Sequence, residues 1–200
     1  MAGVSAYMPV GLRYLFGTSR ENGLGSSSTG MDVVASLDLR GKVIIITGAA
    51  RGLGYEMSRV LYARGAHIIL TARCKQQAEV AANTIKTVEV ATVTAGKAVI
   101  GQITPMECDL SSLSSVRSFA AEFKASGLPL HVLINNGAVM SCDFTRSADG
   151  HELQFAVNHL AHHLLSNLLL ETLVRTAKAA GGSEANAAPA SGQAHGAAVH

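Results

Sequence analysis

Short apolar runs alternate with segments of helical periodicity along the middle of this chain. The runs 42–46 and 67–70 are rich in β-branched or aliphatic residues and predict two buried strands. Between them, a helix is indicated by four apolar residues at helical spacing: Leu53, Met57, Val60 and Leu61. Gly65 predicts the end of this helix. Strand, helix and strand in this order predict an α/β fold with a parallel sheet.

The alternation continues toward the carboxyl end. The range 76–90 predicts a helix with one face formed by Val80, Thr84, Thr87 and Val88. Ser111 and Ser112 predict the start of another helix, which continues to Lys124. The segment 164–170 is apolar nearly all round, and this indicates a helix that is buried on more than one face.

The first predicted strand leads directly into a loop rich in glycine, Thr47-Gly48-Ala49-Ala50-Arg51-Gly52-Leu53-Gly54. Glycine permits a sharp turn and a close approach of the backbone to a phosphate, and the next helix offers free N–H groups at its positive end. The loop therefore predicts a phosphate-binding cradle. Its candidate binding residues are Gly48, Arg51, Gly52, Leu53 and Gly54.

Four motifs in order resemble those of the short-chain dehydrogenase/reductase family. The glycine loop has the spacing Thr-Gly-x-x-x-Gly-x-Gly, and Cys108-Asp109-Leu110 falls where the third strand of that family ends. The segment 133–138, Leu-Ile-Asn-Asn-Gly-Ala, resembles the fourth-strand motif, and 157–160 resembles the helix with the catalytic asparagine. The resemblance covers about 37–180 and is similar to the retinol-dehydrogenase-like and WW-domain-oxidoreductase-like branch.

The resemblance implies a Rossmann-type doubly wound parallel sheet. Only the strands in the order 3-2-1-4 have counterparts in this sequence, so the expected sheet is incomplete and its fourth strand is an edge. Such an edge suggests a homo- or hetero-oligomer. The resemblance further assigns cofactor contacts to five residues outside the glycine loop: Asp109, Leu110, Asn135, Asn136 and Gly137.

One position departs from the family pattern. Ala138 stands where the fourth-strand motif of the family has glycine, because the usual Ala-Gly order is reversed. If the backbone there needs a positive φ or a tight contact, the swap weakens cofactor binding by about 1 kcal/mol or more. The alternative is a shifted loop that makes equivalent contacts.

The end of the second predicted strand indicates the cofactor. An NAD enzyme offers a carboxylate there to the ribose 2′-hydroxyl, whereas an NADP enzyme offers positive charge to the 2′-phosphate. This chain has Arg73 at that place, Arg51 in the glycine loop, and no acid before Glu79. Guanidinium groups suit phosphate geometry, so we predict NADP rather than NAD. The alternative is that both arginines are ordinary solvated charges.

The catalytic groups that the family uses are incomplete here. The family needs a tyrosine whose pKa is lowered by a lysine four residues later, since an isolated phenol has a pKa of about 10. The tyrosines of this sequence are Tyr7, Tyr14, Tyr55 and Tyr62, and none has a lysine four residues on. Only Asn158 of the catalytic groups has a counterpart.

Two functions remain open at this point. One is an NADP-dependent oxidoreductase acting on alcohol or carbonyl groups, such as those of retinoids, steroids or aldehydes, with impaired catalysis in this chain. The other is a non-catalytic cofactor-binding or dimerisation fragment. The expected organisation is a flexible N-terminal extension over 1–36, a partial cofactor-binding domain over 37–180 and a disordered tail over 181–200, which has Val199 as its only large aliphatic residue.

Composition excludes several other classes. Sixteen basic and fourteen acidic residues leave a net charge of +2, which is too small to indicate nucleic-acid or anionic membrane binding. No segment predicts a membrane span. The three cysteines are far apart, and the histidines at 159, 162 and 163 lack a metal-binding spacing, so we expect no metal. The segment before Asp38 fits a flexible extension or a mitochondrial leader, and we expect a cytoplasmic protein.

Overall fold

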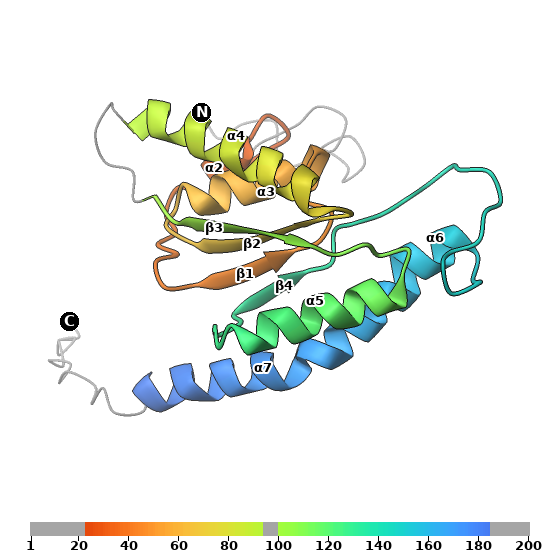
Figure 1. Cartoon of the computed structure of the whole chain (residues 1–200). Coiled ribbons are helices and arrows are strands. Elements are labelled where there is room, and N and C mark those ends of the chain that lie inside the picture. Colours follow the sequence, from red (N-terminus) through yellow and green to blue (C-terminus); the bar gives the residue numbers. More distant parts are fainter. Residues whose placement is uncertain (1–22, 94–99, 185–200) are drawn as a thin grey trace, which may run out of the picture.

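A four-stranded parallel sheet forms the centre of the protein (Figure 1). The computed structural model describes residues 23–93 and 100–184. The strands are β1 (Val43–Ile46), β2 (His67–Ala72), β3 (Gln102–Glu107) and β4 (Val132–Ile134). Their order in the sheet is β3-β2-β1-β4, which confirms the predicted doubly wound arrangement. In the register of the sheet, Ile45 of β1 lies beside Ile69 and Leu133.

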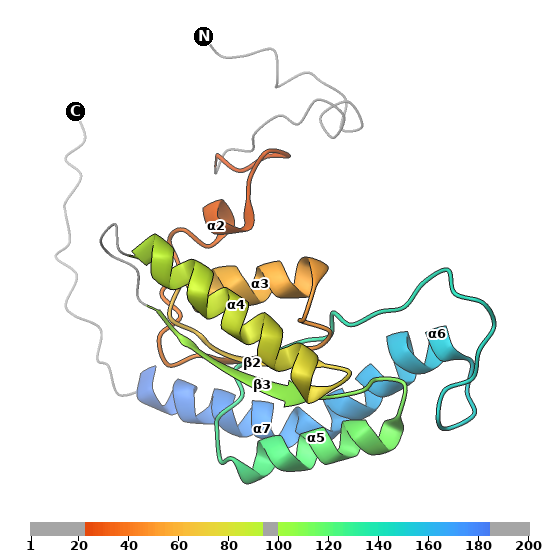
Figure 2. The same ribbon diagram turned by 45° about the horizontal axis from the view of Figure 1, so that its top comes forward.

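Helices cover both faces of the sheet (Figures 1 and 2). One face is covered by α3 (Gly52–Tyr62) and α4 (Lys75–Val93). The other face is covered by α5 (Leu113–Ala125) and α7 (Ala161–Glu184). The short helix α6 (Leu153–Phe155) and the π-helix η2 (Ala156–Leu160) lead directly into α7. The predicted N-cap of α5 is confirmed, because the Ser112 side chain accepts a hydrogen bond from the Ser115 N–H.

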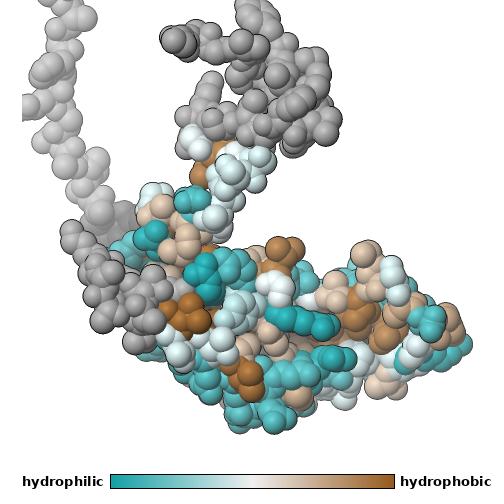
Figure 3. Space-filling model, turned by 90° about the horizontal axis from the view of Figure 1, so that it is seen from above, coloured by the Kyte–Doolittle hydropathy of each residue, from teal (hydrophilic) through white to brown (hydrophobic). Residues whose placement is uncertain are grey.

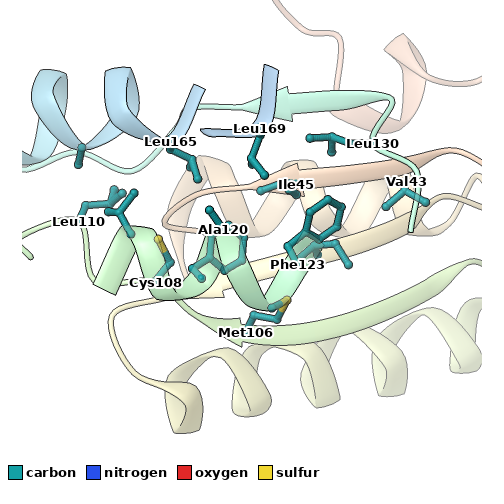
Figure 4. Packing of buried hydrophobic residues seen from close by; sticks show 14 of the residues in the cluster. Val43, Ile45, Met106, Cys108, Leu110, Ala120, Phe123, Leu130, Leu165 and Leu169 are labelled. Carbon is teal, nitrogen blue, oxygen red and sulfur yellow. The ribbon is translucent and has the colours of Figure 1, made fainter. Parts of the chain in front are cut away.

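Alternate residues of the central strand belong to two separate hydrophobic cores. Ile44 and Ile46 pack on the side of α3 and α4, whereas Ile45 packs on the side of α5 and α7. This division follows from the period of two in a strand, and it explains why β1 is apolar at every position. Figure 4 shows the second core, in which Phe123, Leu165 and Leu169 converge on the sheet.

Helix α4 packs on the sheet through the face opposite to its valines and threonines. Its buried residues are small or aliphatic: Ala78, Ala81, Ala82 and Ile85. The predicted face of Val80, Thr84, Thr87 and Val88 is exposed instead, and Figure 3 shows this side of the molecule with hydrophobic side chains scattered among hydrophilic ones. The predicted helix is confirmed, and these four residues do share one face, but the sequence left open which face packs, because both stripes have helical spacing. The alanine stripe allows the closer approach to the sheet.

The two ends of the domain differ from the expected boundaries. Residues Gly30–Val33 form helix α2, which Thr29 and Asp32 start with reciprocal hydrogen bonds, and Val34 is buried after it. Within the expected extension over 1–36, the described residues 23–36 therefore include a capped helix. At the other end, α7 continues to Glu184 rather than ending at 180. The expectations for 1–22 and 185–200 fall outside the described residues and stay predictions.

Strand β4 forms one edge of the sheet. It pairs with β1 and with no other strand of the described ranges. Val132 at its start is 42% exposed, and its other two residues are half-buried. A long connection from β4 to α6 then extends away from the sheet (Figures 1 and 2). The predicted edge is confirmed, whereas the oligomer suggested from it stays a prediction.

Candidate cofactor site

A cavity of about 810 Å³ lies at the carboxyl ends of the strands. Its walls come from the segments that follow each of the four strands, which is where ligands bind in open α/β sheets. Nine of the eleven predicted cofactor-binding residues line it: Gly48, Arg51, Gly52, Leu53, Arg73, Asp109, Leu110, Asn136 and Gly137. The chain thus brings together, in one cavity, residues that are up to 89 positions apart.

The floor of the cavity is a close crossing of two backbones. A Cβ built on Gly48 would lie 2.6 Å from the Cα of Gly137, and Gly48 has a φ of +61°. A Cβ on Gly137 would lie 2.6 Å from Leu110, and one on Gly54 would lie 2.5 Å from the Asn136 amide. The glycine loop therefore needs its glycines here for contact with the end of β4 as well as for any approach of a phosphate.

Ala138 carries no backbone strain. Among the described residues, Ser141 is the only non-glycine residue with a positive φ. The tight position belongs to Gly137, and Ala138 is exposed at the wall of the cavity. Of the two alternatives for the reversed Ala-Gly order, the strained backbone is therefore not found.

Side chains of Thr47 and Asn136 hold the crossing together. The Thr47 hydroxyl accepts the backbone N–H groups of Asn136 and Gly137, both at 2.9 Å. The Asn136 amide donates in turn to the Thr47 carbonyl at 2.9 Å and to the Gly48 carbonyl at 3.3 Å. The hydroxyl also lies 2.9 Å from Nε2 of His162, which is buried at the start of α7.

Two arginines border the cavity on the side of α3 and α4. Arg51 directly precedes α3 and Arg73 directly follows β2, and both side chains are exposed. Neither takes part in an ion pair within the described part of the chain. Asp109 is the one acid among the described lining residues, and its carboxylate accepts hydrogen bonds from the backbone and side chain of Ser111.

Asn158 lies in the π-helix η2, next to the cavity. Its side-chain amide donates to the Val139 carbonyl at 2.8 Å, and its side-chain oxygen accepts the Val139 N–H at 2.9 Å. Val139 lines the cavity, so this pair of bonds attaches the segment after β4 to η2. A π-turn carries one extra residue per turn, and such turns are frequent at functional sites.

The structure separates two predicted residues from the cavity. Asn135 is exposed and donates from its amide to the Ser166 hydroxyl at 3.1 Å, while Gly54 is buried against the Asn136 amide and the Gly48 carbonyl. Leu53, expected as an apolar helix residue, is 79% exposed and belongs to the cavity wall. Sequence reasoning missed further lining residues of α3 and α4: Tyr55, Gln76, Gln77, Val80 and Thr84. The helical pattern placed Val80 and Thr84 on one face of α4 but did not determine whether that face is exposed.

Other reactive side chains lie apart from the cavity lining. Burial raises the pKa of the Cys108 thiol to about 12, with a smaller contribution from Asp109, so this thiol stays protonated. The rings of His159 and His163 stack at 6.1 Å between centroids. Within the described residues, no three histidine, cysteine or acidic side chains gather closely enough to hold a metal.

The family comparison agrees with this arrangement. The family model described as short chain dehydrogenase matches residues 42–198, which is most of the chain. The chain belongs to the short-chain dehydrogenase family. The match includes the glycine loop, the ends of β3 and β4, and Asn158.

Relatives in this family include plant and animal enzymes. "Short-chain dehydrogenase TIC 32 B, chloroplastic" of Brassica napus is 43% identical over 171 residues, covering 82% of this chain and 49% of the relative. "Retinol dehydrogenase 11" of Homo sapiens is 41% identical over 143 residues, covering 72% and 42%. The chain spans about half the length of the curated relatives that it matches.

Solved structures share the fold of this chain. A structure described as a putative uncharacterized protein from Mycobacterium Paratuberculosis is 37% identical with a TM-score of 0.56, covering 70% of this chain and 46% of that one. A metagenomic short-chain oxidoreductase in complex with NADP is 29% identical with a TM-score of 0.55, covering 70% and 59%. In the part of our chain that the structure describes, no helix combines the length and the apolar character needed to cross a membrane.

Proposed function

We propose that this short-chain dehydrogenase family member binds NADP(H) in the cavity at the carboxyl ends of its strands. The main support for NADP(H) is that Arg51 and Arg73 both border this cavity, on the side where β2 ends. The glycine loop offers backbone N–H groups at the start of α3 to the pyrophosphate, and Asp109 with Leu110 contacts the adenine. Arg51 and Arg73 then bind the 2′-phosphate that distinguishes NADP from NAD.

The location of the acids supports this choice of cofactor. An NAD-binding protein of this fold needs a carboxylate at the end of β2, and this chain has Ala72 and Arg73 there. The carboxylate of Asp109 follows β3 and is occupied by Ser111. The similar metagenomic oxidoreductase is described in complex with NADP, which is consistent with the same cofactor here.

The substitution Arg73→Glu tests the proposal. We expect it to weaken NADPH binding by about tenfold or more, because a charge-assisted phosphate contact is replaced by repulsion. NADH binding should stay the same or become tighter. The measurement is the fluorescence of the bound nicotinamide, titrated with both cofactors.

The matched control is Arg117→Glu, which makes the same charge change at an exposed position of α5, away from the cavity lining. This control should leave the ratio of the two affinities unchanged. An Arg73→Glu variant that loses NADPH and NADH equally would contradict an assignment of Arg73 to the 2′-phosphate.

The chemistry of the family is oxidation or reduction of an alcohol or carbonyl, and the bound nicotinamide supplies or accepts the hydride. In this chain Asn158 would stand beside that reaction, held by Val139. The sequence of 200 residues contains no tyrosine with a lysine four positions later. We therefore propose that this chain binds the cofactor but is catalytically impaired.

The second candidate is a non-catalytic cofactor-binding or dimerisation fragment. The edge strand β4 favours it, because the backbone groups on its outer side are available for pairing with a copy or a relative. Turnover separates the two candidates. Reduction of an aldehyde, retinoid or steroid carbonyl by the purified chain with NADPH would contradict a non-catalytic role and favour an oxidoreductase.

A further inference from the structure

The hydrogen bonds of Thr47 determine the direction of its hydroxyl proton. The oxygen has two lone pairs, and the N–H groups of Asn136 and Gly137 occupy both at 2.9 Å. The single proton must therefore be donated. Nε2 of His162 lies at 2.9 Å, whereas the Ile134 carbonyl lies at 3.4 Å, so the histidine nitrogen is the better acceptor.

The same hydrogen bonds also determine the protonation state of His162. Since Nε2 accepts a hydrogen bond from the Thr47 hydroxyl, it carries no hydrogen of its own, and the neutral ring must hold its proton on Nδ1. Nδ1 lies 3.4 Å from the backbone carbonyl oxygen of Asn158, which can accept a hydrogen bond from the Nδ1–H group. One imidazole thus connects the end of β1 with the π-helix that carries Asn158.

We propose that His162 is a positioning residue for the cofactor site. In its neutral Nδ1–H form it fixes the Thr47 hydroxyl, and this hydroxyl holds Asn136 and Gly137 against the glycine loop. The proposal rests on the proposed function, because it treats this crossing as the floor of the NADP(H) site. His162 does not line the cavity itself and acts through Thr47.

Protonation of His162 would break this arrangement. A second N–H would then point at the Thr47 oxygen, whose lone pairs are already occupied. Burial lowers the pKa of His162, and the Asn158 carbonyl opposes this in part. No charged side chain of the described residues contributes to the shift. β1 and β4 contain no titratable residue, and the titratable neighbours along the helix are His159 and His163.

The lowered pKa of His162 makes the folded state less stable at low pH. A histidine that is kept neutral by the fold stabilises the folded state above the pKa of the unfolded chain, about 6.5. That contribution is lost as the pH falls from about 6.5 through the lowered pKa of the folded state. NADP⁺ affinity should fall with protonation of His162 in the folded protein.

The first test needs no cofactor. In the full chain with ¹⁵N-labelled histidine, NMR reports which nitrogen of His162 carries the proton, and the His162→Gln variant assigns the signal. We expect an unprotonated Nε2 at neutral pH and a titration midpoint below about 6.5. A proton on Nε2, or a midpoint at or above that ordinary value, would overturn the proposal.

The second test compares substitutions by titration with NADP⁺ between pH 7.5 and 4.5. His162→Gln offers an uncharged oxygen near the position of Nε2, so it should bind NADP⁺ within about threefold of the unchanged chain at pH 7.5. His162→Leu leaves the Thr47 proton without this acceptor and should bind about tenfold more weakly. His163→Gln, at the exposed neighbouring position, should change neither the affinity nor its pH dependence.

The pH profile separates positioning from a merely structural role. The 2′-phosphate itself titrates near pH 6 in every variant. The unchanged chain should lose additional affinity at low pH that His162→Gln does not lose, and identical profiles would contradict the proposal. If the unchanged chain fails to bind NADP⁺ at pH 7.5, the proposed function fails, and the nitrogen signals still decide the role of His162.

Discussion

The substitution Gly48→Ala should lower the free energy of unfolding by about 3 kcal/mol. Part of this is the cost of a left-handed backbone for a residue with a Cβ, about 1–2 kcal/mol. The rest is a steric clash, since the new Cβ would lie 2.6 Å from the Cα of Gly137. Gly48 has a φ of +61°, so neither contribution can be avoided without moving the glycine loop. Denaturant unfolding measures the effect.

Gly52→Ala is the matched control for Gly48→Ala. Gly52 has nearly the same φ, +59°, but a Cβ there meets nothing within 4 Å. It should therefore cost only the conformational part, about 1–2 kcal/mol. Equal losses in the two variants would show that the crossing of the glycine loop with Gly137 is looser than described.

Phe123→Ala should lower the free energy of unfolding by about 3–5 kcal/mol. Phe123 is fully buried between α5 and the sheet, in the core that also contains Ile45 and Leu169 (Figure 4). Its removal leaves a cavity that the surrounding backbone of helix and sheet cannot fill. The measurement is the denaturant midpoint followed by circular dichroism.

The control for Phe123→Ala is the same change at Phe144. This side chain is 74% exposed in the connection between β4 and α6, where its ring contacts Arg146. Its removal should change stability by less than about 0.5 kcal/mol. A comparable loss at Phe144 would mean that the connection packs more tightly than its exposure indicates.

The fold could be predicted from the chain because two independent signals agreed. The apolar runs at 42–46 and 67–70 are too short for helices, and the glycine loop between them is typical of a turn from a strand into a helix. The motifs after β3 and β4 then determined which strand ends meet. The resulting order β3-β2-β1-β4 placed most of the candidate residues at one cavity.

Other features depend on packing that sequence patterns do not encode. The alanine stripe and the valine-threonine stripe of α4 both have helical spacing, and the alanine stripe is buried because small side chains allow the helix to lie closer to the sheet. The contact between Thr47 and His162 joins residues 115 positions apart. Asn135 and Asn136 are adjacent and alike, yet only Asn136 lines the cavity, because its amide bonds to the Thr47 carbonyl whereas the Asn135 amide bonds to Ser166. Helix α2 was not predicted, because it follows a segment rich in glycine and serine and only the capping pair, Thr29 and Asp32, indicates its start.

A thermal-shift titration of the purified chain with NADPH and with NADH tests the central claim most directly. A ligand that binds the folded state raises the unfolding midpoint by mass action. We expect a cooperative transition whose midpoint rises with NADPH at concentrations where NADH has little effect. A cooperative transition that neither cofactor shifts, or that NADH shifts more, would contradict an NADP(H) site formed by the glycine loop, Arg51 and Arg73.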